Sequence, residues 1–187
     1  MSGLKIAAAL AAVCIMAGAV ASATTVSNGG FENGFTGFTT LGDTSIVDGT
    51  FGVAPTEGNN QALLGTTGVS DADIETALGA AAGSLDAFSA GFANGGTVTN
   101  GSVITRVINT VVGRTLTFDF TFLTSESTPA GFNDGAFFFA DGQFFSLGDT
   151  GSSGFASSPT TFNEQLATST FTHTFTTGGP QVIGFGV

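Results

Sequence analysis

The chain has 187 residues, and its 3 Lys and Arg against 14 Asp and Glu give it a formal net charge of −11 at pH 7. This balance excludes a nucleic-acid-binding protein, because so few cations cannot neutralise a row of phosphates. Charged residues make up only 9% of the chain and hydrophobic residues 42%, which excludes intrinsic disorder and predicts a packed core. The length fits a single domain.

The first 23 residues have the pattern of a secretory signal peptide. Lys5 precedes an apolar run over residues 6–20, and the small residues Ala-Ser-Ala follow at 21–23. The run of about 15 residues is shorter than the roughly 20 that a membrane-spanning helix needs. We therefore expect a signal-peptide helix over residues 1–23 that is removed after Ala23, with a retained anchor helix as the alternative.

Residues 24–187 form the predicted mature domain, which contains no sulfur. Removal of the leader takes away Lys5, Cys14 and both methionines, so 2 Arg stand against 14 Asp and Glu, a formal charge of −12. Without cysteine the domain cannot use disulfides, and apolar burial and backbone pairing must stabilise it. The sequence predicts a secreted, extracellular or cell-surface domain with no membrane span after the leader is removed.

The first half of this domain alternates short apolar runs with Gly, Asn and Thr, a texture typical of an all-β, two-sheet antiparallel sandwich. Strands are expected at Thr44–Val47 and Gln61–Leu64. One helix should follow, because Ser70 can cap it, acidic residues occupy its first turn, and apolar residues keep helical spacing up to Gly83.

The second half carries the clearest strand patterns. In Leu116–Phe122 apolar and polar residues alternate, which places the phenylalanines on one face. Phe137–Phe145 predicts a hairpin, because Asp141-Gly142 suits the positive φ angles of a two-residue type I′ turn. Further strands are expected at Val103–Val112, Ser169–Phe175 and Val182–Val187, and a flexible surface loop at Gly148–Pro159.

Few residues of the chain are typical of catalysis. His173 lies between two phenylalanines, so it is expected in the core or at a sheet edge, and one His without Cys does not make a zinc site. The motifs of nucleophile-elbow hydrolases, zinc peptidases and P-loop proteins are absent from the sequence. We expect a protein that is not an enzyme; if it were one, Glu126 and Asp134 would be its carboxylates.

Two oxygen-rich clusters, Asp71–Glu75 and Asn133-Asp134, suit calcium better than any other ligand. The first cluster lacks the loop glycine of an EF-hand, and helix capping explains it better. The absence of Trp and Tyr disfavours a sugar-binding surface, because flat aromatic platforms with a polar edge are missing.

Several motifs follow one another in an order that resembles a known family. Val26–Glu32, with its Asn-Gly-Gly-Phe-Glu, resembles the opening strand of galactose-binding-like jelly rolls. Together with Pro55–Gly58, the region from Ile74 to Asp86 and Leu116–Glu126, it resembles secreted bacterial proteins that carry a PEP-CTERM sorting signal. The resemblance implies a jelly roll of the cell surface or of the exopolysaccharide and biofilm matrix. In related binding modules the Glu of this motif helps to hold a structural calcium, which nominates Glu32 as a metal ligand.

The chain departs from that family at its end. It stops at Val187, where the family continues into one more strand, and it has no Pro-Glu-Pro, second hydrophobic helix or basic tail. We expect either that the last strand lies beyond this sequence or that another chain supplies it by β-strand addition. The alternatives to a non-enzymatic matrix protein are a calcium-dependent carbohydrate-binding module and a structural subunit that assembles by strand addition. Expected partners are extracellular polysaccharide or another copy of the chain.

Overall fold

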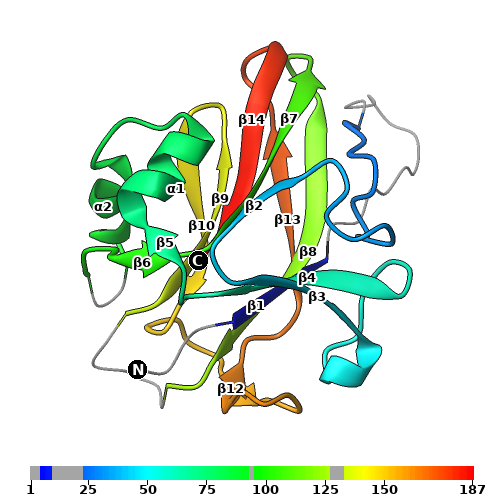
Figure 1. The fold of residues 1–187 in the computed structure, drawn as a ribbon, viewed down its shortest axis with the longest axis vertical. Helices are drawn as coiled ribbons and strands as arrows, with labels where there is room; N and C mark the ends of the chain where they lie inside the picture. The colour runs from blue at the N-terminus through cyan, green and yellow to red at the C-terminus, as the bar shows by residue number, and fades with distance from the viewer. Residues whose placement is uncertain (1–4, 10–22, 93–94, 127–132) are drawn as a thin grey trace.

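The computed structural model describes residues 5–9, 23–92, 95–126 and 133–187, and this part of the chain is mostly β with two short α-helices (Figure 1). Its elements, in chain order, are β1 (Lys5–Ala9), β2 (Thr39–Leu41), β3 (Thr44–Asp48), a 3₁₀ turn (Gly49–Phe51), β4 (Asn60–Gly65), β5 (Val69–Ser70), α1 (Asp71–Leu78), α2 (Ser84–Ser89), β6 (Asn100–Gly101), β7 (Val103–Thr110), β8 (Thr115–Thr124), β9 (Gly135–Ala140), β10 (Gln143–Asp149), β11 (Ala156–Ser157), β12 (Glu164–Gln165), β13 (Ser169–Thr174) and β14 (Gly179–Gly186).

The strands form three antiparallel sheets. The first has the order β11-β12-β8-β1-β4-β3, and β13 also pairs with β8. The second has the order β10-β9-β14-β7-β2, and β5 and β6 form a small third sheet. Because many neighbours in this order are far apart in sequence, the sheets depend on long-range pairing.

Phenylalanine dominates the core that the two large sheets share. Phe118 of β8 lies 4.8 Å from Phe185 of β14 and 5.1 Å from Phe138 of β9, measured between ring centroids. Phe118 and Phe138 are fully buried, as is Phe31, which lies among the turns before β2. The alternation predicted over residues 116–122 is therefore confirmed, because its apolar side forms this core.

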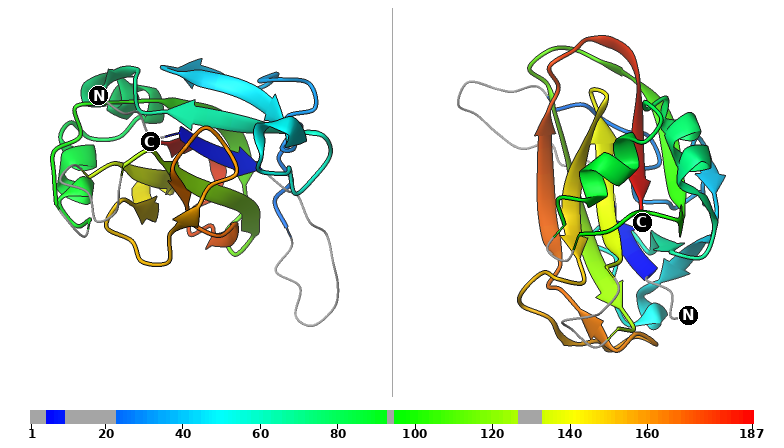
Figure 2. Two further views of the ribbon diagram at one scale, coloured as in Figure 1. Left: turned by 90° about the horizontal axis from the view of Figure 1, so that it is seen from below. Right: turned by 90° about the vertical axis from the view of Figure 1, so that its left-hand side faces the viewer.

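Two smaller clusters cover the outer faces of the sheets. Ile74 and Leu78 of α1 pack with Val103 and Phe137 of the second sheet, and Figure 2 shows both helices on one side of the molecule. On the first sheet, Leu63 and Leu123 pack with apolar side chains from the loops. Strands β4 and β8 therefore carry buried apolar residues on both faces.

The predicted hairpin is confirmed. Gln143 pairs with Ala140, and the two residues between them, Asp141 and Gly142, have φ angles of 51° and 72°. These positive values are those of the two-residue turn that Asp-Gly favours.

The other predicted strands also form, with boundaries that shift by up to three residues. They correspond to β3, β4, β7, β13 and β14. The sequence missed β2, β5, β6, β11 and β12, which are two or three residues long. Short strands give too few alternations for a period to be recognised. The loop expected at Gly148–Pro159 contains the end of β10 and all of β11.

The helical region differs from the single predicted helix. Ser70 does cap α1, since its Oγ accepts a hydrogen bond from Asp73 N at 3.2 Å. The helix ends at Leu78, not near Gly83, because Gly79 adopts a left-handed conformation with a φ of 68°. A second helix, α2, begins at Ser84.

The expected signal-peptide helix lies mostly outside the described residues. Its part at Lys5–Ala9 is strand β1, which pairs with both β4 and β8, and this corrects the helical prediction for these five residues. Pairing satisfies the backbone groups on the facing edges of β4 and β8, a tertiary effect that local pattern does not show. Within the described ranges, no helix is long and apolar enough to cross a bilayer.

Candidate functional site

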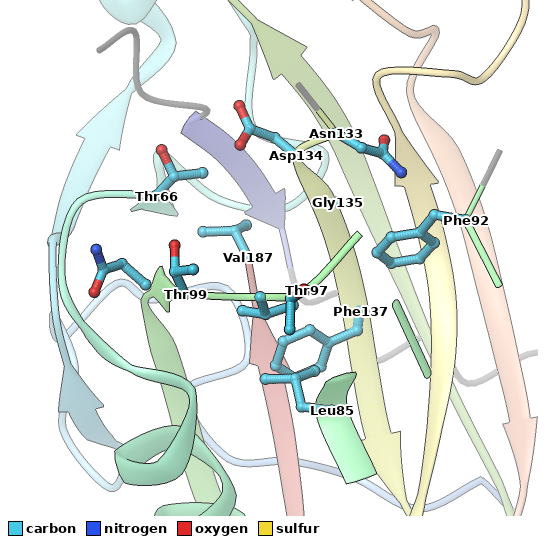
Figure 3. A pocket seen from close by; sticks show the side chains of 12 residues that line it. Thr66, Leu85, Phe92, Thr97, Thr99, Asn133, Asp134, Gly135, Phe137 and Val187 are labelled. Atoms are coloured by element: carbon cyan, nitrogen blue, oxygen red, sulfur yellow. The ribbon is translucent and has the colours of Figure 1, made fainter. Parts of the chain in front are cut away.

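A cavity of about 90 Å³ lies at the end of the second sheet near α2 (Figure 3). It is lined by Thr66, Leu85, Phe92, Thr97, Val98, Thr99, Asn100, Asn133, Asp134, Gly135, Phe137 and Val187. Its volume is below the roughly 300–1,000 Å³ of most small-molecule sites. The space suits a few water molecules rather than a sugar ring.

Asp134 supplies the acid of this cavity, just before β9. Burial, helped by the negative charge of Glu126, raises the pKa of Asp134 to about 6. The structure therefore brings the two carboxylates named from the sequence within electrostatic reach of each other. Glu126 does not line the cavity, and among the described lining residues Asp134 is the one ionisable side chain.

Asn133, beside this acid, has a structural role. Its Nδ2 donates to Gly95 O at 3.3 Å, and its Oδ1 accepts from Thr150 Oγ1 at 3.0 Å. The backbone of the next residue also takes part, because Thr150 N donates to Asp134 O at 3.0 Å. The described lining residues thus offer one carboxyl with a raised pKa and several hydroxyls, and no second ionisable group is among them.

Glu32 ties two loops together. Its Oε1 accepts hydrogen bonds from Asn59 N at 2.7 Å and Asn60 N at 2.8 Å. The backbone amides of Asn59 and Asn60 lower the pKa of Glu32, because they stabilise its charged form. Gly58, with a φ of 67°, lies so close that a Cβ there would collide with the carboxylate.

The calcium site predicted at Glu32 stays a prediction. Within the described residues, no three His, Cys, Asp or Glu side chains gather where they could hold a metal ion. The two oxygen-rich clusters belong to different parts of the fold: Asp71 and Asp73 lie in the first turn of α1, and Asp134 lines the cavity.

The segment around Glu32 is a series of turns, not the opening strand that the resemblance implied. Asn28 adopts a φ of 57°, its Nδ2 donates to Gly34 O at 2.9 Å, and its Oδ1 accepts from Asn33 N at 3.0 Å. These side-chain bonds take the place of a strand ladder, as Asn often does in turns. Arg106 of β7 holds the same segment by donating to Ser27 O and Ser27 Oγ.

His173 is 7% exposed, which confirms the prediction that it belongs to the core or a sheet edge. Its ring packs against Phe145 and Phe175, with centroids 4.9 Å away in each case. Its Nε2 lies 3.0 Å from Oδ2 of Asp141, in the hairpin turn. The sequence missed this partner, because Asp141 was explained fully by the turn.

Asp141 also accepts hydrogen bonds from Thr176 N at 2.8 Å, Thr176 Oγ1 at 3.0 Å and Thr177 Oγ1 at 2.7 Å. Burial opposes its charge, but the bonds from Thr176, Thr177 and His173 outweigh burial and hold the pKa of Asp141 well below its usual range. This carboxylate therefore joins the β9–β10 hairpin to the β13–β14 connection. Such a saturated acceptor is suited to stability rather than catalysis.

No family model, curated protein or solved structure matches this chain. The likeness to PEP-CTERM proteins thus stays a prediction from the sequence motifs.

Proposed function

We propose that this chain is the precursor of a secreted, non-enzymatic protein of the bacterial cell surface or exopolysaccharide matrix. The observation that carries the proposal is the leader pattern of residues 1–23 in front of an acidic, sulfur-free β domain. A domain without Cys and Met also lacks the side chains that oxidise most readily outside the cell.

The fold proposed for this domain is a β-sandwich of the jelly-roll kind. Its support is the shared cluster in which side chains of the first sheet, such as Leu64 and Phe122, meet Ile104 and Phe185 of the second. Two antiparallel sheets that bury one face against each other are the usual basis of a sandwich.

The contacts of the ionisable groups favour a structural domain over an enzyme. Asp141 and His173 join two connections, and Glu32 joins two loops. Glu75 fixes the start of α2 through Gly83 N and Leu85 N. These groups are committed to holding loops, whereas catalysis needs an acid or base free to exchange a proton with substrate.

Export and processing test the proposal directly. When the full chain is expressed in a bacterium with an intact secretion system, we expect it outside the cytoplasm with Thr24 as its first residue. N-terminal sequencing and intact mass of the exported protein would show this. Full-length protein retained in the cytoplasm would contradict the proposal.

A matched pair of variants makes the test specific. Ala23→Asp places a charged residue at the position where cleavage needs a small one, and we expect at least a tenfold loss of processed protein. Ser22→Asp adds the same charge at the middle position of the Ala-x-Ala exit, which is not restricted, so processing should continue. Equal loss in both variants would point to a general charge effect and not to recognition of this site.

A further inference from the structure

Strand β1 occupies the middle of the first sheet (Figure 1). It pairs antiparallel with β4 on one side, with Ile6 opposite Leu64, and with β8 on the other side, with Ile6 opposite Phe122. The far edge of β4 is taken by β3, and the far edge of β8 by β12 and β13. Strand β1 is therefore the link between two parts of this sheet.

Cleavage after Ala23, on which this inference rests through the proposed function, would remove β1. The facing edges of β4 and β8 would then be about 10 Å apart, twice the spacing of neighbouring strands, and too far apart to pair directly. Their free N–H and C=O groups would be left between two apolar layers, where unpaired backbone groups are costly.

We propose that the processed chain uses this space as a strand-acceptor site, which binds an extended segment of another polypeptide antiparallel to both β4 and β8. We call the space between Asn60–Gly65 and Asp119–Leu123 the acceptor slot. Binding there is β-strand addition with hydrogen bonds on both sides of the guest strand, whereas addition at a sheet edge uses one side only.

The walls of the slot specify the chemistry of the guest. On one face, Ala62, Leu64 and Phe122 belong to the core shared by the two sheets. On the other face, Leu63 and Leu123 belong to the outer cluster. A strand buried on both faces is a continuous apolar run, so the guest should be apolar at every position, with small residues where it lies between Ala62 and Phe120.

Charge specifies one end of the guest. Gly65, at the end of β4, lies beneath the carboxylate of Asp43, so close that a Cβ on Gly65 would collide with Oδ2. A basic residue opposite Gly65 would meet this carboxylate in a domain of charge −12. The register places Lys5 of β1 at this position. The guest is therefore a short apolar segment preceded by Lys or Arg.

A separate polypeptide fits the slot better than a second copy of the mature domain. Every strand that the structure describes already pairs with another strand of the same chain. A second copy would have to break its own sheets in order to donate one, whereas an extended segment of another protein would lose no pairing.

The test uses the full chain, made by cell-free synthesis without membranes so that the leader is kept. A protease site is inserted between residues 16 and 17, outside the described ranges. After cleavage, a fluorescent peptide with the sequence of residues 3–10 is added, and fluorescence anisotropy and native mass spectrometry follow its binding.

We expect the peptide to replace the leader fragment at a ratio of one to one. Hydrogen exchange should show equal protection of the amides of β4 and β8 in the fragment and peptide complexes. The control peptide carries Ala7→Pro, which removes a backbone donor and does not fit a strand paired on both sides, so it should bind at least tenfold more weakly. The same substitution in the uncleaved chain should lower its melting temperature. This measurement tests the position of β1 between β4 and β8 without replacing the leader fragment by a peptide.

Three results would overturn the proposal. The first is equal binding of the two peptides, or no exchange together with an unchanged melting temperature of the Ala7→Pro chain. The second is unfolding on cleavage that added peptide does not reverse. The third is an oligomer of the cleaved chain that the peptide dissociates, because the guest would then be a second copy. Since the leader is cut in vitro, failure of export in cells would count against the proposed function alone.

Discussion

Two carboxylates of this protein have pKa values that are shifted in opposite directions. Four hydrogen bonds lower the pKa of Asp141, whereas burial and the charge of Glu126 raise the pKa of Asp134 to about 6. The sequence contains both as ordinary Asp residues in or near turns. The residues that bind Asp141 are 32 or more positions away in the sequence. Local sequence pattern therefore could not distinguish Asp141 from Asp134.

We expect Asp141→Asn to destabilise the fold by about 2 kcal/mol at pH 7, because an amide cannot accept all the bonds that the carboxylate receives. Since the pKa of Asp141 is lowered in the folded state, its contribution is present above pH ~4 and is lost as the pH falls further. Urea unfolding of the wild type and the variant would measure this, and the difference between their free energies of unfolding should be smaller at pH 3 than at pH 7.

Asp119→Asn is the matched control for this change. Asp119 accepts a hydrogen bond from Thr170 Oγ1 at a partly exposed position of β8. We expect a loss within about 0.5 kcal/mol, as is usual for surface positions. Equal losses in the two variants would contradict the role assigned to Asp141.

For Asp134 the expected effect has the opposite sign. Its pKa is raised from 3.8 to about 6, so the folded state loses stability as the pH rises through this interval. Asp134→Asn should therefore stabilise the protein at pH 8 by about 1 kcal/mol, a value reduced because water screens this partly exposed group.

The gain from Asp134→Asn should shrink as the pH falls from about 6 towards 3.8, and it should disappear only below this lower value, where the carboxyl is protonated in both states. Glu126→Gln should move the pKa of Asp134 down, because it removes a nearby negative charge, and NMR titration would measure the change. A variant that is equally stabilised at pH 4 and pH 8 would show that charge is not the cause.

At the scale of elements, the side chain of Glu75 joins α1 to α2, a role that the sequence did not predict. From the sequence, Glu75 is one of several acidic residues near the start of α1, where negative charge favours the helix dipole. In the structure it is 3% exposed and accepts hydrogen bonds from Gly83 N at 2.9 Å and Leu85 N at 2.7 Å. It thus serves as a cap for α2, whose own cap residue, Gly83, has no side chain to do so.

We expect Glu75→Ala to cost about 2 kcal/mol, since two backbone amides lose their acceptor. Glu75→Gln should cost less, because its amide oxygen still accepts one bond. Thr76→Ala, at an exposed position on the same helix, serves as the control. Thermal unfolding of the three variants would rank them, and a loss for Thr76→Ala as large as that for Glu75→Ala would contradict the capping role.

The elements that the sequence predicted well are those with a local cause. Alternation defined β8, and Asp141-Gly142 defined the hairpin. The two-residue strands β11 and β12 have no such signal. They exist because β12 pairs with β8 and β11 in turn pairs with β12. Strand β1 is the extreme case, since its apolar residues resemble a leader helix and are strand only in the presence of β4 and β8.

At the scale of the whole molecule, the mostly β architecture could be predicted, and the arrangement of the candidate site could not. The composition and the hydrophobic period that predict a β fold are averaged over many residues, so an error at a few positions does not change the prediction. The cavity around Asp134 depends on where residues such as Thr66, Phe92 and Val187 meet, which only the topology decides. Sequence reasoning did name Asp134 and Glu126, because they flank a loop between two strongly predicted strands.

The position of β14 has a consequence for biogenesis. This strand lies at the centre of the second sheet and pairs with β7 and β9, although its residues, 179–186, are made after all the others of that sheet. The sheet therefore cannot close while a ribosome is still synthesising the chain up to these residues, and such distant pairing is slow even afterwards. A nascent chain whose second sheet closes this late stays unfolded for longer than a chain whose N-terminal part folds first. It can therefore pass through a narrow translocation channel for a longer time.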